Sequence, residues 1–549
     1  MRRLRFVLVA LAGLAASAAR AGVEGVVAGR TEWSGTVEVT ADVWVPPGSE
    51  LVIRSGTRVR FAEALSTKTD PVFWHPGTEL AVEGRLVVEG TPDAPVVFDG
   101  EGWGGLVAAP GGRVRLRGVR IRNAQEGLLA VGARAVLEAV EIEGGEFGLV
   151  AGPGSRIEAA GTRIRVEGVG VLEAGGQVVG GPVEVAADDA DRLRVPPAEP
   201  EAALVPVPPA RGPRVEYVGE YTVARDETWR GEVVVAGRVT VVPEAVLTLA
   251  PGTHVRFRRI DTNGDGLGEG ELLVLGGIRS LGTLAAPVVF ESAEAEPRPG
   301  DWDKVSLVAS EDPDNRFRFT VFRHGVQALH AHFSAMTVDS CLFTDNLRAV
   351  QFQESPEAEI RSSAFWRNKQ ALRFRDSRVR VIGSWFGENW FGVHAFRAEL
   401  EFRGNRMVGQ ALGNFLAKEG RVVVEDCRFE AARDGARFKD PDGVVRVRGC
   451  EIRNVAQDAL SFSRVEARVE GAVLEGAGLD LVGVDRARVV LRGNRFGRAG
   501  RDAIHLSGPA EVDARRNRWE GRPPERIHDG EDEPGLGRVL WRPAEEEPE

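Results

Sequence analysis

Hydrophobic and polar residues alternate in short segments that recur along the second half of the chain every 21 to 23 residues. Each segment is a triplet: its first residue is small or carries an amide, its second varies, and its third is large and apolar. Side chains alternate between the two faces of a strand, so the first and third residues point to the same side. The triplets are Cys341–Phe343, Ser363–Phe365, Ser384–Phe386, Asn405–Met407, Cys427–Phe429, Cys450–Ile452, Ala472–Leu474, Asn494–Phe496 and Asn517–Trp519.

Two further strands complete each repeat. A second strand follows most triplets, as at Leu372–Phe374, and a third opens the next repeat, as at Val422–Val424. One repeat cannot bury its apolar face alone, so successive repeats must stack to form a core. The pattern predicts an all-β protein: a right-handed parallel β-helix with about 22 residues and three short strands per coil.

A longer internal repeat divides the chain into two modules. The segment Trp33–Phe61 matches Trp229–Phe257 at a constant offset of 196 residues without a gap. Seven prolines between residues 195 and 213 indicate an extended linker between the modules. We expect a signal peptide at 1–21, a short first β-helix module at 22–190, a Pro-rich linker at 191–214, a long second module with a C-terminal cap at 215–543, and an acidic tail at 544–549.

The N-terminus predicts export. Met1–Arg5 is basic, Phe6–Ala16 is apolar, and Ala19–Ala21 fits a small-x-small cleavage site. No later stretch approaches 18 apolar residues, so the sequence predicts no transmembrane segment in the mature chain. We therefore expect a bacterial envelope protein, periplasmic or extracellular. The net charge of −11 argues against nucleic acid as a partner.

The repeat resembles the pectin-lyase-like β-helix superfamily, and within it the bacterial right-handed β-helix repeat group. The closing segments Asn517–Gly521, Ile527–Asp529 and Gly537–Pro543 are similar to the end of many such proteins. The resemblance implies the fold but not one function, because this architecture serves lyases, hydrolases, epimerases, adhesins and scaffolds. The motif set of the polygalacturonase-type hydrolases is largely missing here: Arg323–Gly325 matches only part of one motif.

One loop has the beginning of a calcium-binding pattern. Asp261, Asn263 and Asp265 place oxygen side chains at alternate positions, and Gly266 follows them. Such spacing turns hard oxygens inward, and Glu269 is available as a further carboxylate. The twelfth position of the loop is Leu272 rather than Glu, so the complete EF-hand pattern fails. The loop predicts either a structural calcium site or a polar turn without an ion.

Four aspartates form a second candidate site. Asp434, Asp458, Asp480 and Asp502 are spaced by 24, 22 and 22 residues, and each precedes the second strand of its coil. Stacked in register, their carboxylates would lie roughly 5 Å apart, which suits cation binding or catalysis. Aspartate in front of a strand is also an ordinary turn-capping residue. Both interpretations stay open at this point.

A third candidate site lies on the outer face of the first strand. The variable middle residues of the triplets include Trp385, Arg406 and Arg428, and Trp390 and His394 lie close by in the sequence. Arginine forks onto carboxylates, and tryptophan presents a flat apolar surface to a sugar ring. These five residues predict a binding site for an acidic polysaccharide; a solvated variable face is the alternative.

The sequence therefore favours an exported, non-catalytic scaffold or binding protein of the cell envelope. Its expected partners are a polysaccharide, held along the side face, or an envelope protein. The alternative is an enzyme, a lyase, hydrolase or epimerase acting on acidic glycans, with the aspartate column as its catalytic candidate. Calcium is the one cofactor that the residues suggest. The oligomeric state stays open.

Overall fold

The computed structural model describes residues 22–64, 71–197, 207–440, 443–521 and 526–543. The predicted signal peptide and acidic tail lie outside the described residues. The chain divides into unit 1 (residues 1–195), with strands β1 to β19, and unit 2 (residues 196–549), with strands β20 to β57. Within the described ranges, no helix is long and apolar enough to cross a membrane.

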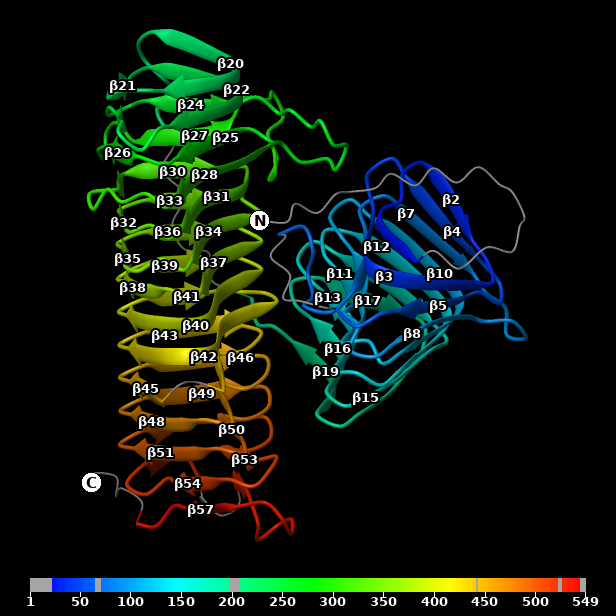
Figure 1. Ribbon diagram of the computed structural model, residues 1–549. Coiled ribbons are helices and arrows are strands. Elements are labelled where there is room, and N and C mark those ends of the chain that lie inside the picture. Colours follow the sequence, from blue (N-terminus) through cyan, green and yellow to red (C-terminus); the bar gives the residue numbers. More distant parts are fainter. Residues whose placement is uncertain (1–21, 65–70, 198–206, 441–442, 522–525, 544–549) are drawn as a thin grey trace. The chain divides into compact units, whose positions relative to one another are not determined.

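Each coil of unit 2 contributes one strand to each of three parallel sheets, here named A, B and C (Figure 1). In one such coil β35 (Ala358–Arg361) belongs to sheet C, β36 (Ala364–Trp366) to sheet A and β37 (Gln370–Arg375) to sheet B. Every strand pairs in parallel with its counterpart one coil further on, as β36 does with β39 (Trp385–Gly387). The predicted right-handed parallel β-helix of two modules, with three short strands per coil, is thereby confirmed.

The remaining strands of unit 2 follow the same order. Sheet A also contains β24 (His254–Phe257), β27 (Val288–Ser292), β30 (Thr320–Arg323), β33 (Leu342–Thr344), β41 (Arg406–Val408), β43 (Arg428–Ala432), β46 (Glu451–Val455), β49 (Val473–Ala477), β52 (Arg495–Phe496) and β55 (Arg518–Trp519). Sheet B also contains β25 (Glu271–Val274), β28 (Trp302–Val308), β31 (Gly325–His332), β34 (Arg348–Gln353), the first halves of β40 (Phe391–Arg403) and β42 (Gly413–Glu425), β44 (Ala436–Lys439), β47 (Leu460–Ser463), β50 (Val482–Asp485), β53 (Ile504–Leu506) and β56 (Ile527–His528). Sheet C also contains β21 (Glu227–Trp229), β23 (Val246–Leu249), β26 (Gly277–Leu281), β29 (Arg316–Arg318), β32 (Met336–Asp339), β38 (Arg378–Ile382), the second halves of β40 and β42, β45 (Val444–Arg448), β48 (Glu466–Glu470), β51 (Arg488–Arg492), β54 (Glu511–Asp513) and β57 (Arg538–Leu540), while β20 (Arg214–Val223) and β22 (Glu232–Val241) run through both A and B.

Unit 1 repeats this arrangement with fewer coils. Its sheet A contains β5 (Arg58–Phe61), β8 (Val96–Gly100), β15 (Thr162–Val166) and β18 (Val183–Ala187). Its sheet B contains β1 (Val23–Val26), β6 (Glu79–Val82), β9 (Gly105–Ala108), β11 (Glu126–Ala130), β13 (Phe147–Ala151), β16 (Val169–Glu173) and β19 (Ala190–Arg194). Its sheet C contains β2 (Arg30–Trp33), β4 (Glu50–Arg54), β7 (Arg85–Glu89), β14 (Arg156–Ala160) and β17 (Gln177–Gly180), and β3 (Thr36–Val45), β10 (Arg113–Arg122) and β12 (Arg134–Glu143) each run through two sheets.

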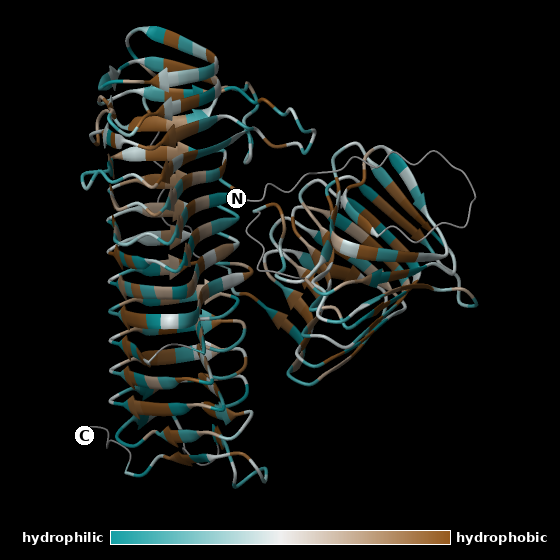
Figure 2. Cartoon of the chain, in the orientation of Figure 1, coloured by the Kyte–Doolittle hydropathy of each residue, from teal (hydrophilic) through white to brown (hydrophobic). Residues whose placement is uncertain are grey.

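A stack of phenylalanine rings fills the core of unit 2 beneath sheet A. The ring centroids of Phe322, Phe343, Phe365 and Phe386 are 4.7, 5.0 and 4.8 Å apart along the stack, and neighbouring planes differ by no more than 7°. All four side chains are fully buried. Hydrophobic residues recur at equivalent places from coil to coil (Figure 2). The third residue of each triplet therefore faces the core, as the alternation predicted.

An asparagine ladder closes the corner between sheets A and B. The Nδ2 atom of Asn346 donates to Oδ1 of Asn368 (2.9 Å), and Nδ2 of Asn368 donates to Oδ1 of Asn389 (3.0 Å). The same oxygens accept the backbone N–H groups of the preceding members. In the next coil the ladder position holds Gln410, whose amide nitrogen bonds to Phe386 O and Val408 O. The ladder satisfies buried backbone groups that the turn would otherwise leave unpaired.

The repeated header packs in the same way in both units. The rings of Phe61 and Trp103 stack at 4.1 Å in unit 1, and their counterparts Phe257 and Trp302 stack at 4.6 Å in unit 2. Each indole donates from Nε1 to a backbone carbonyl oxygen of the next coil at 2.8 Å. The sequence repeat is thus a repeat of three-dimensional contacts.

Many corners between strands use the left-handed backbone region, often without glycine. In unit 1 the corner between sheets C and A is occupied by Gly118, Ala139 and Gly161 in successive coils, with φ of 58°, 53° and 59°. A side chain in this region costs about 1–2 kcal/mol, and glycine carries no such penalty. Ala139 is therefore a strained member of a column whose neighbours are unstrained.

We expect Ala139→Gly to stabilise unit 1 by about 0.5–1 kcal/mol. Glycine removes the backbone strain of an alanine at positive φ, and this gain outweighs the conformational entropy that glycine adds to the unfolded chain. Ala139 is exposed, so loss of its methyl group removes little burial. Urea unfolding measures the effect. The matched control is Ala160→Gly at the end of β14, also exposed, where glycine should destabilise by a similar amount. Equal destabilisation by both substitutions would contradict the strain argument.

Candidate functional site

Two tryptophans, the buried Trp366 (8% exposed) and the half-buried Trp385, form an aromatic patch on the outer face of sheet A. Trp366 and Trp385 come from β36 and β39, and their rings stack at 4.6 Å with an angle of 25°. Gly387 lies in the same outer column as Trp366. A β-carbon at Gly387 would lie 2.5 Å from the Trp385 ring and 2.6 Å from the Trp366 ring. The missing side chain at Gly387 therefore makes room for both indoles.

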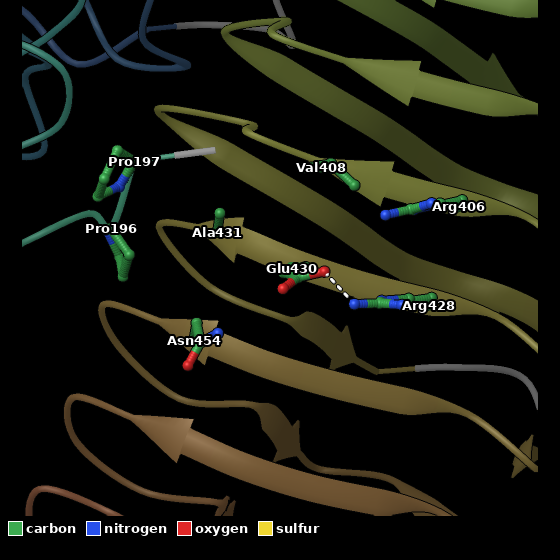
Figure 3. Close-up of a pocket in the computed structure, with 8 residues that line it drawn as sticks. All are labelled: Pro196, Pro197, Arg406, Val408, Arg428, Glu430, Ala431 and Asn454. Carbon is green, nitrogen blue, oxygen red and sulfur yellow. Dashed lines mark ion pairs between the residues drawn. The ribbon is translucent and has the colours of Figure 1, made fainter. Parts of the chain in front are cut away.

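Two arginines continue this face on the next two coils. Trp385 pairs with Arg406, which pairs with Arg428, so the three side chains form one outer column. Figure 3 shows Arg406 and Arg428 on adjacent strands, with an ion pair of 2.6 Å between Nη2 of Arg428 and Oε2 of Glu430. Arg406, Arg428 and Glu430, with Val408, partly line a pocket of about 300 Å³. The structure thus brings together three of the residues predicted to bind polysaccharide; their role stays a prediction.

The other two predicted binding residues lie around the corner from the aromatic patch. Trp390 occupies the turn between β39 and β40, and His394 is on β40 in sheet B. The Phe391 ring contacts the His394 ring edge-on at 5.6 Å. The predicted cluster is therefore divided between sheets A and B, with Trp390 at the corner that joins them.

Basic and amide side chains line the outer face of sheet B. Arg348 and Gln370 are paired neighbours in one column, and Gln351, Arg373 and His394 follow one another in the second. Nε of Arg348 donates to Oε1 of Gln370 at 2.8 Å, and Nη1 of Arg348 donates to Oε1 of Gln351 at 2.5 Å. Nε2 of Gln370 lies 3.0 Å from Nδ1 of His394. We call these five residues the sheet B strip.

Burial and arginine charges shift two pKa values in the sheet B strip. Burial, followed by the charges of Arg373 and Arg348, lowers the pKa of His394 to about 3. Burial and the charge of Arg375 lower the pKa of Arg373 as well. His394 is therefore neutral at pH 7, while the arginines keep their charge. Sequence reasoning missed Trp366, Arg348, Gln370 and Arg373. Each of them lies two residues or one coil length from another residue of the same outer face, and that spacing was the available signal.

The four predicted aspartates do form one column. Each lies two residues before a strand of sheet B, and the in-register pairing of β44, β47, β50 and β53 aligns them. The backbone N–H of Asp480 donates to Oδ1 of Asp458 (3.3 Å), and that of Asp502 donates to Oδ1 of Asp480 (3.1 Å). Asp434 Oδ1 accepts from the backbone N–H of Asn414 (3.0 Å). Each of these three carboxylates therefore accepts a hydrogen bond from the backbone of an adjacent coil.

Arginines compensate two of these carboxylates. Arg501 donates to both oxygens of Asp480, from Nε at 3.0 Å and from Nη2 at 2.6 Å. Nε of Arg437 lies 3.1 Å from Oδ2 of Asp434. Asp458 instead accepts from the Ser461 hydroxyl at 2.8 Å. Burial, together with the Asp480 carboxylate, raises the pKa of Asp458 to about 6.

Within the described part of the chain, one group of three potential metal ligands converges. It consists of Asp480, Asp502 and His505, whose ligand atoms lie within 4.8 Å of one another. His505 Nδ1 is 2.9 Å from Asp502 Oδ2, and Arg501 already binds Asp480.

The predicted calcium loop is closed by its own side chains. Asp261 accepts from the backbone N–H groups of Gly264 (2.8 Å) and Gly266 (3.0 Å). Asn263 Oδ1 accepts from the backbone N–H of Asp265, and Asn263 Nδ2 donates to Asp265 Oδ2 (2.8 Å). The fourth predicted ligand, Glu269, accepts from the Thr262 hydroxyl at 2.6 Å. Calcium at this loop stays a prediction.

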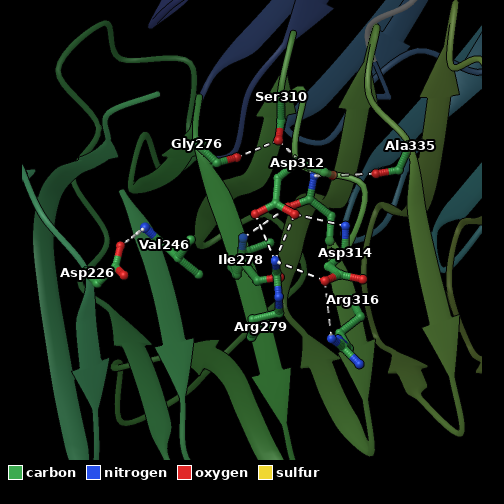
Figure 4. A network of polar contacts seen from close by, with 11 residues as sticks. Asp226, Val246, Gly276, Ile278, Arg279, Ser310, Asp312, Asp314, Arg316 and Ala335 are labelled. Carbon is green, nitrogen blue, oxygen red and sulfur yellow. Dashed lines mark hydrogen bonds and ion pairs between the residues drawn. The ribbon is translucent and has the colours of Figure 1, made fainter. Parts of the chain in front are cut away.

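Two further polar networks hold coils together. On sheet C, Nη2 of Arg279 contacts both oxygens of Asp312 at 2.7 and 2.8 Å (Figure 4). On sheet A, the buried Glu291 carboxylate accepts from Nε of Arg256 (2.9 Å) and Nε of Arg323 (2.8 Å), and it lies 3.4 Å from Nδ1 of His254. Burial opposes ionisation of Glu291, but the contacts of His254, Arg323 and Arg256 lower its pKa to about 2.

The architecture is the right-handed parallel β-helix that the sequence predicted. No protein-family model and no curated protein matches the sequence. Among solved structures, the chain is similar to a PL6-family alginate lyase (8% identity, 93% of this chain and 100% of that chain covered, TM-score 0.22). It is also similar to a GH136 lacto-N-biosidase from Eubacterium ramulus (8% identity, 85% of this chain and 62% of that chain covered, TM-score 0.15). A third similar structure is a mannuronan C-5 epimerase A-module from Azotobacter vinelandii (11% identity, 86% of this chain and 91% of that chain covered, TM-score 0.13). At these scores the similarities say nothing about the function of this chain.

Proposed function

We propose that unit 2 is a binding module for an acidic polysaccharide, held along sheets A and B, in an exported protein of the bacterial envelope. The observation that carries the proposal is the stacked pair Trp366–Trp385 over Gly387, followed one and two coils later by Arg406 and Arg428. A flat aromatic surface suits the apolar face of a pyranose ring, and arginine suits a carboxylate. Binding energy at such surfaces is concentrated in tryptophan and arginine.

The spacing of the coils supports a polymeric ligand. Neighbouring parallel strands lie about 4.8 Å apart, so each outer column presents one side chain per step of this length. An extended sugar chain running along the column meets a new side chain at nearly every residue. Arginine and amide side chains on sheet B are of the kind that binds carboxylates.

Trp385→Ala should weaken retention on immobilised polygalacturonate or alginate by about tenfold or more, because the truncated side chain removes a stacking surface of hot-spot type. Gly387→Ala should act similarly, since its β-carbon displaces both indoles. Affinity electrophoresis of the mature protein measures both effects. Trp541→Ala is the control, because Trp541 lies after the last strand, β57, far along the chain from the aromatic patch. Equal retention of all four proteins would refute the proposed site.

The alternative is an enzyme that acts on acidic glycans, and one observation favours it. Asp458, with its pKa raised to about 6, lies next to Asp480, which accepts hydrogen bonds from Arg501. A carboxyl group with a raised pKa is suited to general acid–base catalysis. Release of unsaturated or reducing ends that Asp458→Asn abolishes would establish this activity. Retention without turnover would support the binding module.

A further inference from the structure

The first strand of unit 2 has one free edge within the described part of the chain. β20 pairs with β22 along its whole length, and no other described strand is in register with it. It is ten residues long, whereas β1, the first strand of unit 1, has four. Natural sheets commonly shield their edges with short strands, lysine, proline or bulges. β20 contains neither lysine nor proline, so the N–H and C=O groups of its free edge can pair with a further strand.

The core of unit 2 ends beneath β20 in a partly exposed apolar surface. The rings of Tyr217 and Tyr221 stack at 4.0 Å, and the Tyr217 ring lies 5.5 Å from that of Trp229. Both tyrosines pack against the core of unit 2 but are only half-buried. Val215 is 41% exposed, and Val218, on the outer face, is 75% exposed. Apolar surface of this kind beside a free strand edge marks an interaction site.

The sequence of β20 is self-complementary about Gly219. Counted in either direction from this glycine, tyrosine is the second residue and valine the fourth. Gly219 has a φ of 75° and pairs with Gly237, at the corner between the sheet A and sheet B arms of β22. A two-fold axis through this corner lays the sheet A arm of one copy antiparallel along the sheet B arm of a second copy.

The two-fold arrangement matches the side chains on both faces of the strand. A shift of one residue would set inner positions against outer ones, which makes this register specific. No like charges lie directly opposite each other, and the inner face brings apolar side chains together. The cross-strand pairs are Val215–Val223 and Tyr217–Tyr221 on the inner face, and Glu216–Thr222 and Val218–Glu220 on the outer face.

From this pairing we infer that two copies of the chain form a dimer through β20, in which the two unit 2 β-helices are joined end to end by an antiparallel strand pair. The backbone groups of the two free edges bind each other, and the tyrosine rings of both copies close one continuous core. Glu216 adds no repulsion across the contact, because Nε of Arg258 binds its carboxylate at 2.7 Å. Both copies use the same surface, so the contact closes after two copies.

Two substitutions at Val218 test the dimer. Val218→Glu sets a carboxylate directly opposite Glu220 at both symmetry-related pairs, so the dissociation constant of the dimer should rise about tenfold or more. Val218→Lys sets an ammonium group opposite Glu220 instead, and it should dimerise at least about tenfold more tightly than Val218→Glu. Sedimentation equilibrium of the full chain measures these constants.

The two Val218 variants share their controls. Val218 is 75% exposed, so both variants should fold with the urea midpoint of the parent protein. Leu284→Glu places the same new charge at an 80% exposed leucine outside β20, and it should dimerise like the parent. A parent protein that stays monomeric at every concentration would overturn the inference. So would a dimer that Val218→Glu and Val218→Lys weaken equally, because Val218 would then not face Glu220.

Cross-linking tests the register of the strand pair. Val218→Cys and Glu220→Cys are made in separate proteins, which are mixed and oxidised in air. We expect mainly the mixed disulfide, since positions 218 and 220 face each other across the two-fold axis and identical positions do not. The three native cysteines are buried and contribute little background. Mixed and identical cross-links in equal yield would overturn the antiparallel register, while polysaccharide binding is tested independently of either result.

Discussion

Phe365→Ala is expected to destabilise unit 2 by about 3–5 kcal/mol, because it removes a fully buried ring and leaves a cavity. The ring of Phe365 lies between those of Phe343 and Phe386, at centroid distances of 5.0 and 4.8 Å. Parallel coils pinned by backbone pairing on both sides cannot collapse into the gap. The urea midpoint of the full chain, followed by circular dichroism, measures the loss.

Two controls define the cause of that loss. Phe333→Ala removes the same side chain from a position that is 52% exposed, and it should change stability by no more than about 0.5 kcal/mol. Phe365→Leu keeps most of the buried volume and should cost under about 1.5 kcal/mol. A midpoint for Phe365→Ala equal to that of Phe333→Ala would show that the ring stack contributes little to stability.

Glu291→Gln is expected to destabilise unit 2 by about 1.5–3 kcal/mol near neutral pH, since a neutral amide replaces a buried carboxylate that binds the partly exposed Arg256 and Arg323. The folded-state pKa of Glu291, about 2, lies below its ordinary value of 4.5. Its contribution is therefore fully present above about pH 4.5 and is lost as pH falls through about 2. The difference in urea midpoint between parent and variant should shrink over that interval.

Glu89→Gln is the matched control for this ion cluster. Glu89 pairs with Arg54 at 2.6 Å, but its side chain is 53% exposed. Exposed pairs contribute about 0–1 kcal/mol, so the control should lie close to the parent protein at every pH. If the two variants showed equal losses, burial would not be what makes the Glu291 cluster strong.

The sequence predicted the repeating contacts and missed those that depend on which outer columns lie side by side. The triplet pattern placed Phe343 and Phe365 in the core because a strand has a strict period of two. The same pattern aligned Trp385, Arg406 and Arg428, since they share one position in successive triplets. Trp366 was missed because it lies just after its triplet, and it meets Trp385 only because Gly387 has no side chain.

Polar contacts across coils were harder to predict than the core. The spacing of the aspartates placed Asp458 beside Asp480, but it could not show that Arg501 binds one of them and Ser461 the other. The hydrogen-bonded chain from Arg348 through Gln370 to His394 joins residues 22 and 24 positions apart. Such links depend on side-chain conformation, whereas the core depends only on the order of apolar residues.

The equivalence of the coils has a consequence for how this protein can change in length. Removal or duplication of one complete coil leaves the phenylalanine stack and the asparagine ladder in register, whereas loss of one residue within a strand turns every following side chain to the wrong face. Descendants of such a chain should therefore gain and lose length in whole coils. Each added coil extends the outer columns by one side chain, so the number of coils sets how many side chains a column presents.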